Sequence, residues 1–249
     1  MDRKGRMASV HKIKDMKFFK RFNDIGNDYV HTDKHIHTKW VDGQATILEI
    51  IQKAEELSLR QIAFTEHIRR DSVYFSGYLN EIQNVKGKSS LEILSGFEAK
   101  IMNFEGDIDI ADEAMQRSEI LIGSVHRFPI GRKLFSPREF TKSLCQEIEL
   151  ELSIAAIKKR TCNVLGHPGG MSLRAYNEFP LNSLEEIIKE CVQNDVAFDF
   201  NSSYHLHVIK DLITLFRQHN PYISFGSDAH FLNQLGSWVK ILEEQKIHV

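Results

Sequence analysis

Apolar residues along this chain follow two alternating patterns. Seven short runs, rich in β-branched and aromatic residues, have the length of buried strands. They occupy residues 27–37, 60–67, 91–100, 120–126, 162–170, 196–203 and 222–230. Between them lie longer stretches with apolar residues three or four positions apart, as at Ile47, Ile50, Ile51 and Ala54. This spacing predicts amphipathic helices that bury one face.

The alternation predicts the fold class. Strands that alternate with helices run parallel, because each helix carries the chain back to the start of the next strand. No Gly-x-Gly-x-x-Gly follows the first strand, which disfavours a dinucleotide-binding fold. We therefore expect an α/β barrel of about seven βα units, formed as a single domain by residues 29–249. The basic residues 1–28 are expected to form a tail or a packing helix, with Ile13, Met16 and Phe19 at helical spacing.

Helix starts are marked by Ser or Thr followed three positions later by Glu, the spacing of a capping box. These pairs are Thr46 and Glu49, Ser136 and Glu139, and Ser183 and Glu186. Pro137 suits a first helical position, where its missing N–H is not needed. A long helix is therefore expected from about Pro137 to Arg160.

Composition narrows the functional classes. Apolar residues make up 42% of the 249 residues and the formal net charge is −2, which favours a globular domain without general attraction to nucleic acid. No apolar run approaches membrane-spanning length, and the N-terminus lacks the apolar segment of a secretory signal. Three widely spaced cysteines, Cys145, Cys162 and Cys191, predict a reduced, cytoplasmic protein without a thiolate zinc site.

Side chains that can bind metals stand at the carboxyl ends of the predicted strands. In chain order they are His35, His37 and Asp42, then Glu66 and His67, Glu98, His126, His167, Asp199 and Asn201, and Asp228 and His230. Seen alone, His35 and His37 could equally be outward-facing strand residues or part of a solvated loop. Because the carboxyl ends of barrel strands meet on one face, the repetition favours a shared site.

The residue types in this set indicate metal chemistry. Imidazole and carboxylate ligands suit Zn, Mn, Fe or Mg. His35 and His37 are two positions apart on a strand, so both rings face the same side. The candidate ligands outnumber what one ion needs, so we expect two or three ions. Such a site can hydrolyse phosphate esters with a metal-bound hydroxide, which requires no protein nucleophile. No Gly-x-Ser-x-Gly and no P-loop is present.

These motifs resemble those of the PHP (polymerase and histidinol phosphatase) metallo-hydrolases. In the order of that family they read "HIHTKWVDG", "FTEH", "GFEA", "GSVH", "GHPGG", "FNSS" and "FGSDAH", and the resemblance spans residues 30–235. It implies a distorted (β/α)7 TIM-like barrel and a phosphoesterase that uses two to three divalent ions. Zn, Mn or Fe would be expected, with Mg as a further choice.

The resemblance also implies how the ligands are shared. His35, His37, Glu98 and Asp228 would hold one ion, Asp42, His67 and His230 a second, and Glu98, His126 and His167 a third, with Glu98 as the bridge. Two positions vary or depart from the family pattern. The position of Asp42 is His in some relatives, and Asp199 stands where Glu is common. The shorter acid leaves its contacts open, and Asn201 could equally be a scaffold residue. Glu66 and Asn201 are expected beside the ligands.

Basic residues near the strand ends are candidates for binding phosphate. Arg127 directly follows His126, and Arg174 lies in the segment after "GHPGG". The planar guanidinium group can bind phosphate oxygens with two parallel hydrogen bonds. Lys39 and Arg132 are further candidates. The alternative for each is a solvated loop charge.

Three functions fit these observations. The first is a phosphomonoesterase acting on a small metabolite such as histidinol phosphate, a sugar phosphate or a nucleotide. The second is a phosphodiesterase or 3′–5′ exonuclease with the same metals. Against it stand the lack of net positive charge and of a groove that combines basic and aromatic residues. The third is a metal-binding regulatory module without catalysis. The sequence leaves the oligomeric state open.

Overall fold

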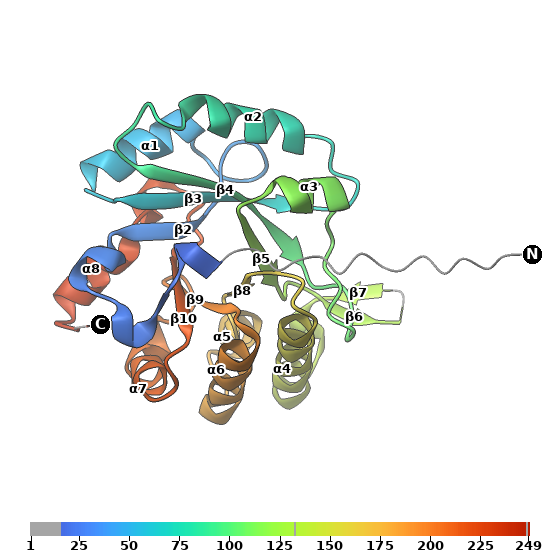
Figure 1. The fold of residues 1–249 in the computed structure, drawn as a ribbon. Helices are drawn as coiled ribbons and strands as arrows, with labels where there is room; N and C mark the ends of the chain where they lie inside the picture. Colours follow the sequence, from blue (N-terminus) through green and yellow to red (C-terminus); the bar gives the residue numbers. More distant parts are fainter. Residues whose placement is uncertain (1–15, 132, 248) are drawn as a thin grey trace, which may run out of the picture.

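The computed structural model describes residues 16–131, 133–247 and 249, and it contains a sheet of seven parallel strands curled into a barrel (Figure 1). The parallel strands are β2 (Thr32–Ile36), β3 (Gln61–Ile68), β4 (Glu92–Lys100), β5 (Ile120–Ser124), β8 (Val164–Gly166), β9 (Ala197–Asn201) and β10 (Tyr222–Gly226). Their order in the sheet is β10-β9-β8-β5-β4-β3-β2, and the two-residue β1 (Lys20–Arg21) adds antiparallel to β10.

The barrel closes where its first and last parallel strands meet. Ile36 and Ala229 form a parallel bridge. The His37 N–H donates to the Ala229 carbonyl at 2.9 Å, and the Ala229 N–H donates to the His35 carbonyl at 3.2 Å. The seam therefore joins the end of β2 directly to the loop after β10. The distorted (β/α)7 barrel expected from the sequence is confirmed.

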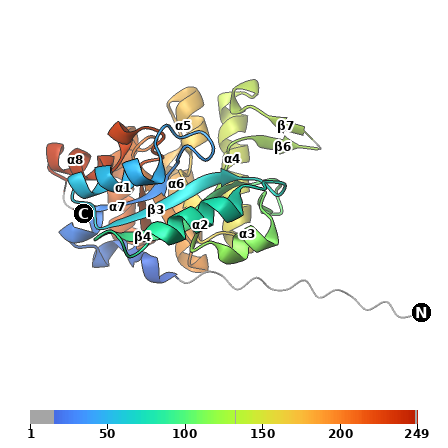
Figure 2. The same cartoon turned by 90° about the horizontal axis from the view of Figure 1, so that it is seen from above.

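Helices cover the outside of the sheet. They are α1 (Ile47–Glu56), α2 (Phe75–Val85), α3 (Asp112–Arg117), α4 (Lys142–Lys159), α5 (Gly170–Tyr176), α6 (Leu181–Asn194), α7 (Ile209–His219) and α8 (Ser237–Glu244). In Figure 1, α1 and α2 lie over β3 and β4, while α4, α6 and α7 lie on the other side of the barrel. A hairpin of β6 (Phe128–Ile130) and β7 (Lys133–Phe135) projects beside α4, as Figure 2 shows.

Short 3-10 helices fill several connections. They are η1 (Met16–Phe18), η2 (Phe22–Asp24), η3 (Asn27–Val30), η4 (Pro137–Glu139), η5 (Leu206–Val208) and η6 (Leu232–Gln234). The long helix expected from Pro137 to Arg160 is wrong at its start. The helix is interrupted after η4, and α4 begins at Lys142 with Thr141 as its N-cap. Thr141 Oγ1 accepts from the Leu144 N–H at 3.5 Å and so supplies its own start signal.

Two of the three expected capping boxes are confirmed. Thr46 and Glu49 form one at the start of α1, with the Thr46 N–H donating to Glu49 at 2.8 Å. Ser136 and Glu139 form the second at η4. The pair beginning at Ser183 is wrong: Ser183 is buried inside α6, which begins two residues earlier with Pro180 as its cap. The fixed φ of Pro180 suits the residue before a helix, so α6 starts there and Ser183 does not act as the N-cap.

The segment before β2 closes the amino-terminal end of the barrel. Phe19 is buried and packs against the inward-facing Ala63, Leu94, Ile120, Ile122, Val164 and Ala197. In residues 16–28, 3-10 turns and β1 replace the packing helix that we expected, and Ile13 lies outside the described residues. This apolar plug leaves the carboxyl ends of the strands as the open face of the barrel. The division at residue 28 stays a prediction.

Candidate metal centre

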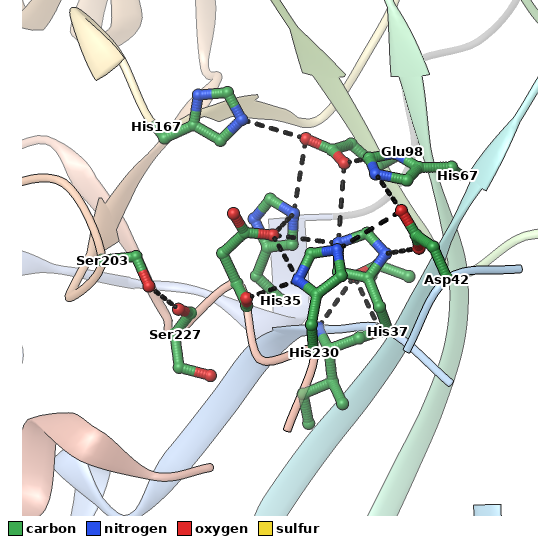
Figure 3. Close-up of polar contacts among 12 residues, drawn as sticks. His35, His37, Asp42, His67, Glu98, His167, Ser203, Ser227 and His230 are labelled. Atoms are coloured by element: carbon green, nitrogen blue, oxygen red, sulfur yellow. Dashed lines mark hydrogen bonds and ion pairs between the residues drawn. The ribbon is translucent and has the colours of Figure 1, made fainter. Parts of the chain in front are cut away.

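Nine side chains of the types that bind metals gather at the open end of the barrel, and Figure 3 shows most of them. They are the expected His35, His37, Asp42, His67, Glu98, His126, His167, Asp228 and His230. Alternation along β2 turns His35 and His37 to the same side, with ring centroids 5.3 Å apart. Both rings are fully buried, whereas Asp42 lies at the exposed rim.

Glu98, near the end of β4, is the centre of the group. Five imidazole rings surround its carboxylate: His67 at 2.8 Å, His167 at 3.1 Å, His126 at 3.2 Å, His35 at 3.4 Å and His37 at 3.6 Å. Burial alone would raise the pKa of the Glu98 carboxyl, but the neighbouring histidines outweigh it and hold the pKa well below its usual value. Glu98 is therefore an anion that more than one metal ion could share.

Three overlapping groups have ligand atoms within 4.8 Å of one another. They are His35, His37, Glu98 and Asp228; His37, Asp42, His67 and His230; and His67, Glu98 and His126. The first two groups contain the sets implied by the family resemblance. In the third, His67 appears in place of the expected His167. His167 is nevertheless close, with its Nε2 3.2 Å from Nε2 of His126.

The donor atoms fit a metal better than they fit one another. Nε2 of His35 and both ring nitrogens of His37 are buried and make no hydrogen bond with the described residues. Carboxylate oxygens nevertheless lie 3.0 to 3.9 Å from them. Two ligands about 2.1 Å from a tetrahedral ion are themselves about 3.4 Å apart. Because a buried polar atom without a partner is unfavourable, the arrangement is one that divalent cations would complete.

Left-handed backbone occurs at two of the nine residues. Asp228 has φ of 55° and His167 has φ of 30°. Four of the other non-glycine residues with positive φ end helices, where this conformation is common, but these two do not. Strain of this kind persists where surrounding contacts enforce it, and it is concentrated at functional sites.

Asp33, which sequence reasoning missed, supplies contacts that hold the Asp228 loop. Its carboxylate accepts from the backbone N–H of Ser227 at 3.0 Å, of Gly236 at 2.9 Å and of His35 at 3.3 Å. This one side chain therefore ties the end of β2 to the loop that carries Asp228. Burial raises the pKa of the Asp33 carboxyl to about 6.

Asp199 reaches two of the candidate metal ligands despite its short side chain. Its Oδ2 lies 2.9 Å from Nδ1 of His35 and accepts from the His167 N–H at 3.0 Å. The contact that the sequence left open is therefore present. Asn201 donates to the same oxygen at 3.0 Å, which favours its scaffold role. Glu66 is buried and accepts from the Thr38 N–H, and burial raises its pKa to about 7.

A cavity of about 1310 Å³ opens above these ligands, and both Arg127 and Arg174 line it. The phosphate contact expected of Lys39 stays a prediction: Lys39 is not among the residues that line the cavity, and it pairs with Glu49 near the exposed start of α1. Arg132 lies outside the described residues.

Four residues of the cavity region were not predicted. Arg69 and Lys100 line the wall, two positions beyond His67 and Glu98, a spacing that strand alternation could have revealed. Tyr204 stacks on His167 with ring centroids 4.6 Å apart. The buried Glu149 accepts from the backbone N–H of Met171 and Ser172 and so anchors α5, which carries Arg174.

Comparison with known proteins agrees with this geometry. A probable phosphatase of Clostridium botulinum is 28% identical over 84% of this chain and 82% of its own length. A probable phosphatase of Caldicellulosiruptor bescii is 26% identical over 84% of this chain and 83% of its own. The fold is similar to that of histidinol phosphate phosphatase from Lactococcus lactis, solved with Zn, L-histidinol and phosphate. That likeness has a TM-score of 0.66 and 19% identity, and covers 87% of this chain and 94% of the other.

The family follows from a match over most of the chain. The PHP domain matches residues 33–203, which run from within β2 to just past β9 and hold seven of the nine gathered side chains. The resemblance seen in the sequence motifs is thereby confirmed, and this chain belongs to the PHP domain family.

Proposed function

We propose that this protein is a metal-dependent phosphatase that hydrolyses the phosphoric monoester of a small metabolite. The observation that carries the proposal is Glu98, a buried carboxylate ringed by five histidines at the floor of a cavity. The family and the probable phosphatases among its relatives support a hydrolase of this class.

The nine side chains named above would hold two or three divalent ions, with Glu98 shared between them. When bound, such ions lower the pKa of water toward neutrality and offset the negative charge of phosphate oxygens. Nitrogen and oxygen ligands without thiolate suit Zn, Mn or Fe, with Mg as a further choice. Zn in the Lactococcus lactis structure favours zinc as the first ion to test.

The protein groups around the ions would bind and orient the substrate. Asp199 holds Nδ1 of His35, so that Nε2 on the other side of the ring faces Glu98 and could bind a metal ion. Arg127 and Arg174 would contact oxygens of the transferred phosphoryl group from the cavity wall. No side chain needs to act as the nucleophile.

The substrate class rests on the size and charge of the cavity. Its volume of about 1310 Å³ accommodates a small phosphorylated metabolite, such as a sugar phosphate, a nucleotide or histidinol phosphate. The same volume would also admit a diester, so a phosphodiesterase is the second candidate. A regulatory metal-binding module is a weaker alternative, because a binding module has no need of the basic residues on the wall.

A cytoplasmic location is part of the proposal. It is supported by three buried cysteines that form no disulfide. Among the described residues, no helix combines the length and apolar character needed to cross a membrane.

The test compares two chromogenic esters. Protein loaded with Mn or Zn would be given p-nitrophenyl phosphate and bis-p-nitrophenyl phosphate, with Glu98→Gln as the inactive reference. Faster hydrolysis of the monoester is expected. Faster hydrolysis of the diester would establish the second candidate, and hydrolysis of neither by metal-loaded protein would overturn both.

A further inference from the structure

Three basic residues, Arg69, Lys100 and Arg127, follow the candidate metal ligands His67, Glu98 and His126 by one or two positions, and we call them the row of basic residues. Ile68 pairs with Ala99, so Arg69, the residue after β3, lies beside Lys100 at the end of β4. Arg127 lies in the connection from β5 to β6, three residues after Ser124, which pairs with Lys100. Arg69 is two residues beyond His67, and Lys100 is two residues beyond Glu98, which turns each pair to the same side of its strand. Two residues along a strand span about 6–7 Å, which sets the distance between the row of basic residues and the row of candidate ligands, His67 and Glu98.

The three basic side chains face the cavity. Arg69, Lys100 and Arg127 all line it, and none forms an ion pair with the described residues. Asp109 is near Lys100, but its carboxylate accepts from the Arg70 N–H. Cations that repel one another in a cavity would be stabilised by a bound anion.

The proposed phosphatase reaction does not use the whole row. In that proposal the transferred phosphate contacts the ions and two arginines of the cavity wall, Arg127 and Arg174. Arg174 comes from α5, after β8, and is close enough to Tyr204 to affect its pKa. Arg69, just after β3, and Lys100, at the end of β4, have no role in binding the transferred phosphate.

We propose that Arg69 and Lys100, with Arg127 beside them, form a second anion subsite, and that the substrate is a phosphomonoester with another anionic group. This rests on the proposed phosphatase function. The second group, a carboxylate or a further phosphate, would lie about 6–7 Å from the transferred phosphate, the separation of the two rows.

A matched pair of substrates tests the subsite. We would compare 4-carboxyphenyl phosphate with its neutral carboxamide, and add 1,4-phenylene bisphosphate to distinguish a carboxylate from a phosphate. The expected result is a kcat/KM at least about tenfold higher for the two compounds that carry a second anionic group than for the carboxamide. Arg69→Gln and Lys100→Met should each reduce this ratio severalfold. Lys210→Met, which removes an exposed lysine on α7 outside the cavity, should not change it.

A binding measurement separates this proposal from the phosphatase itself. Calorimetric titration of the metal-loaded protein with 4-carboxybenzylphosphonate and its carboxamide requires no turnover. Tighter binding of the carboxylate, lost in Arg69→Gln, supports the subsite even if neither ester is hydrolysed. Equal kcat/KM for charged and neutral esters with equal phosphonate binding would overturn the subsite while leaving the phosphatase intact. Absence of both hydrolysis and binding would overturn both.

Discussion

Oδ2 of Asp199 lies 2.9 Å from Nδ1 of His35, and Nε2 on the opposite side of that ring lies 3.4 Å from Glu98. A carboxylate on one ring nitrogen fixes the tautomer and leaves the other nitrogen free to bind a metal. The same oxygen accepts the His167 N–H, so Asp199 orients two candidate ligands from different strands.

Asp199→Ala should therefore weaken metal binding. Loss of such a supporting contact reduces metal affinity by about 10- to 100-fold. Asp199→Asn keeps one acceptor and should recover part of the loss. Titration of the metal-free protein with Zn would measure both. Asp195→Ala is the control, because Asp195 pairs with Arg21 away from the centre. Unchanged affinity in Asp199→Ala would show that His35 needs no support.

Glu98→Gln should remove more than one ion per chain and reduce phosphatase activity to background. The amide cannot supply the negative charge that five imidazoles surround. Elemental analysis of purified protein and hydrolysis of p-nitrophenyl phosphate would measure the two effects. Glu185→Gln removes a carboxylate that pairs with His219 on the surface and should preserve both. Full metal content in Glu98→Gln would contradict a shared carboxylate.

Lys34 should make folding stability depend on pH. Its side chain is fully buried in β2, next to Thr32 and over the ring of Tyr29, and burial lowers its pKa to about 7. The unfolded chain therefore binds this proton more tightly. Burial of Lys34 therefore lowers the free energy of unfolding at neutral pH. This loss is absent above about pH 10.5, the unfolded value, and grows as the pH falls to about 7.

Lys34→Met should abolish this dependence and stabilise the metal-free protein at pH 7 by a few kcal/mol, the order of magnitude given by a pKa shift of this size. Urea unfolding of the wild type and the variant between pH 7 and 10 in the presence of a chelator would measure it. A constant difference across that range would mean that Lys34 keeps its charge in the folded state.

Arg127→Gln and Arg174→Gln should raise KM for a phosphomonoester by about tenfold each, the usual effect of losing one charge-assisted hydrogen bond. Metal content should stay the same, because neither side chain belongs to the three ligand groups. Arg138→Gln, in η4 and outside the cavity, is the matched control. An unchanged KM in either variant would identify that arginine as a solvated charge.

Much of the fold and the site was predictable because the relevant signals are local. Apolar periodicity distinguishes helices from strands, and the alternation of the two determines the parallel barrel. Once the strands are parallel, their carboxyl ends share one face. His35, Glu98, His126 and Asp228 therefore had to approach one another wherever the exact strand boundaries fell.

What the sequence determined by itself is thus the barrel and the identity of the gathered ligands. Only the tertiary structure decided that His67 lies between two ligand groups, that Asp199 reaches His35, and that Lys39 pairs away from the cavity. It also decided that Phe19 fills the closed end and that Arg69 lies beside Lys100. The physical reason is that these relations depend on register between strands and on packing between distant segments, which no local periodicity encodes.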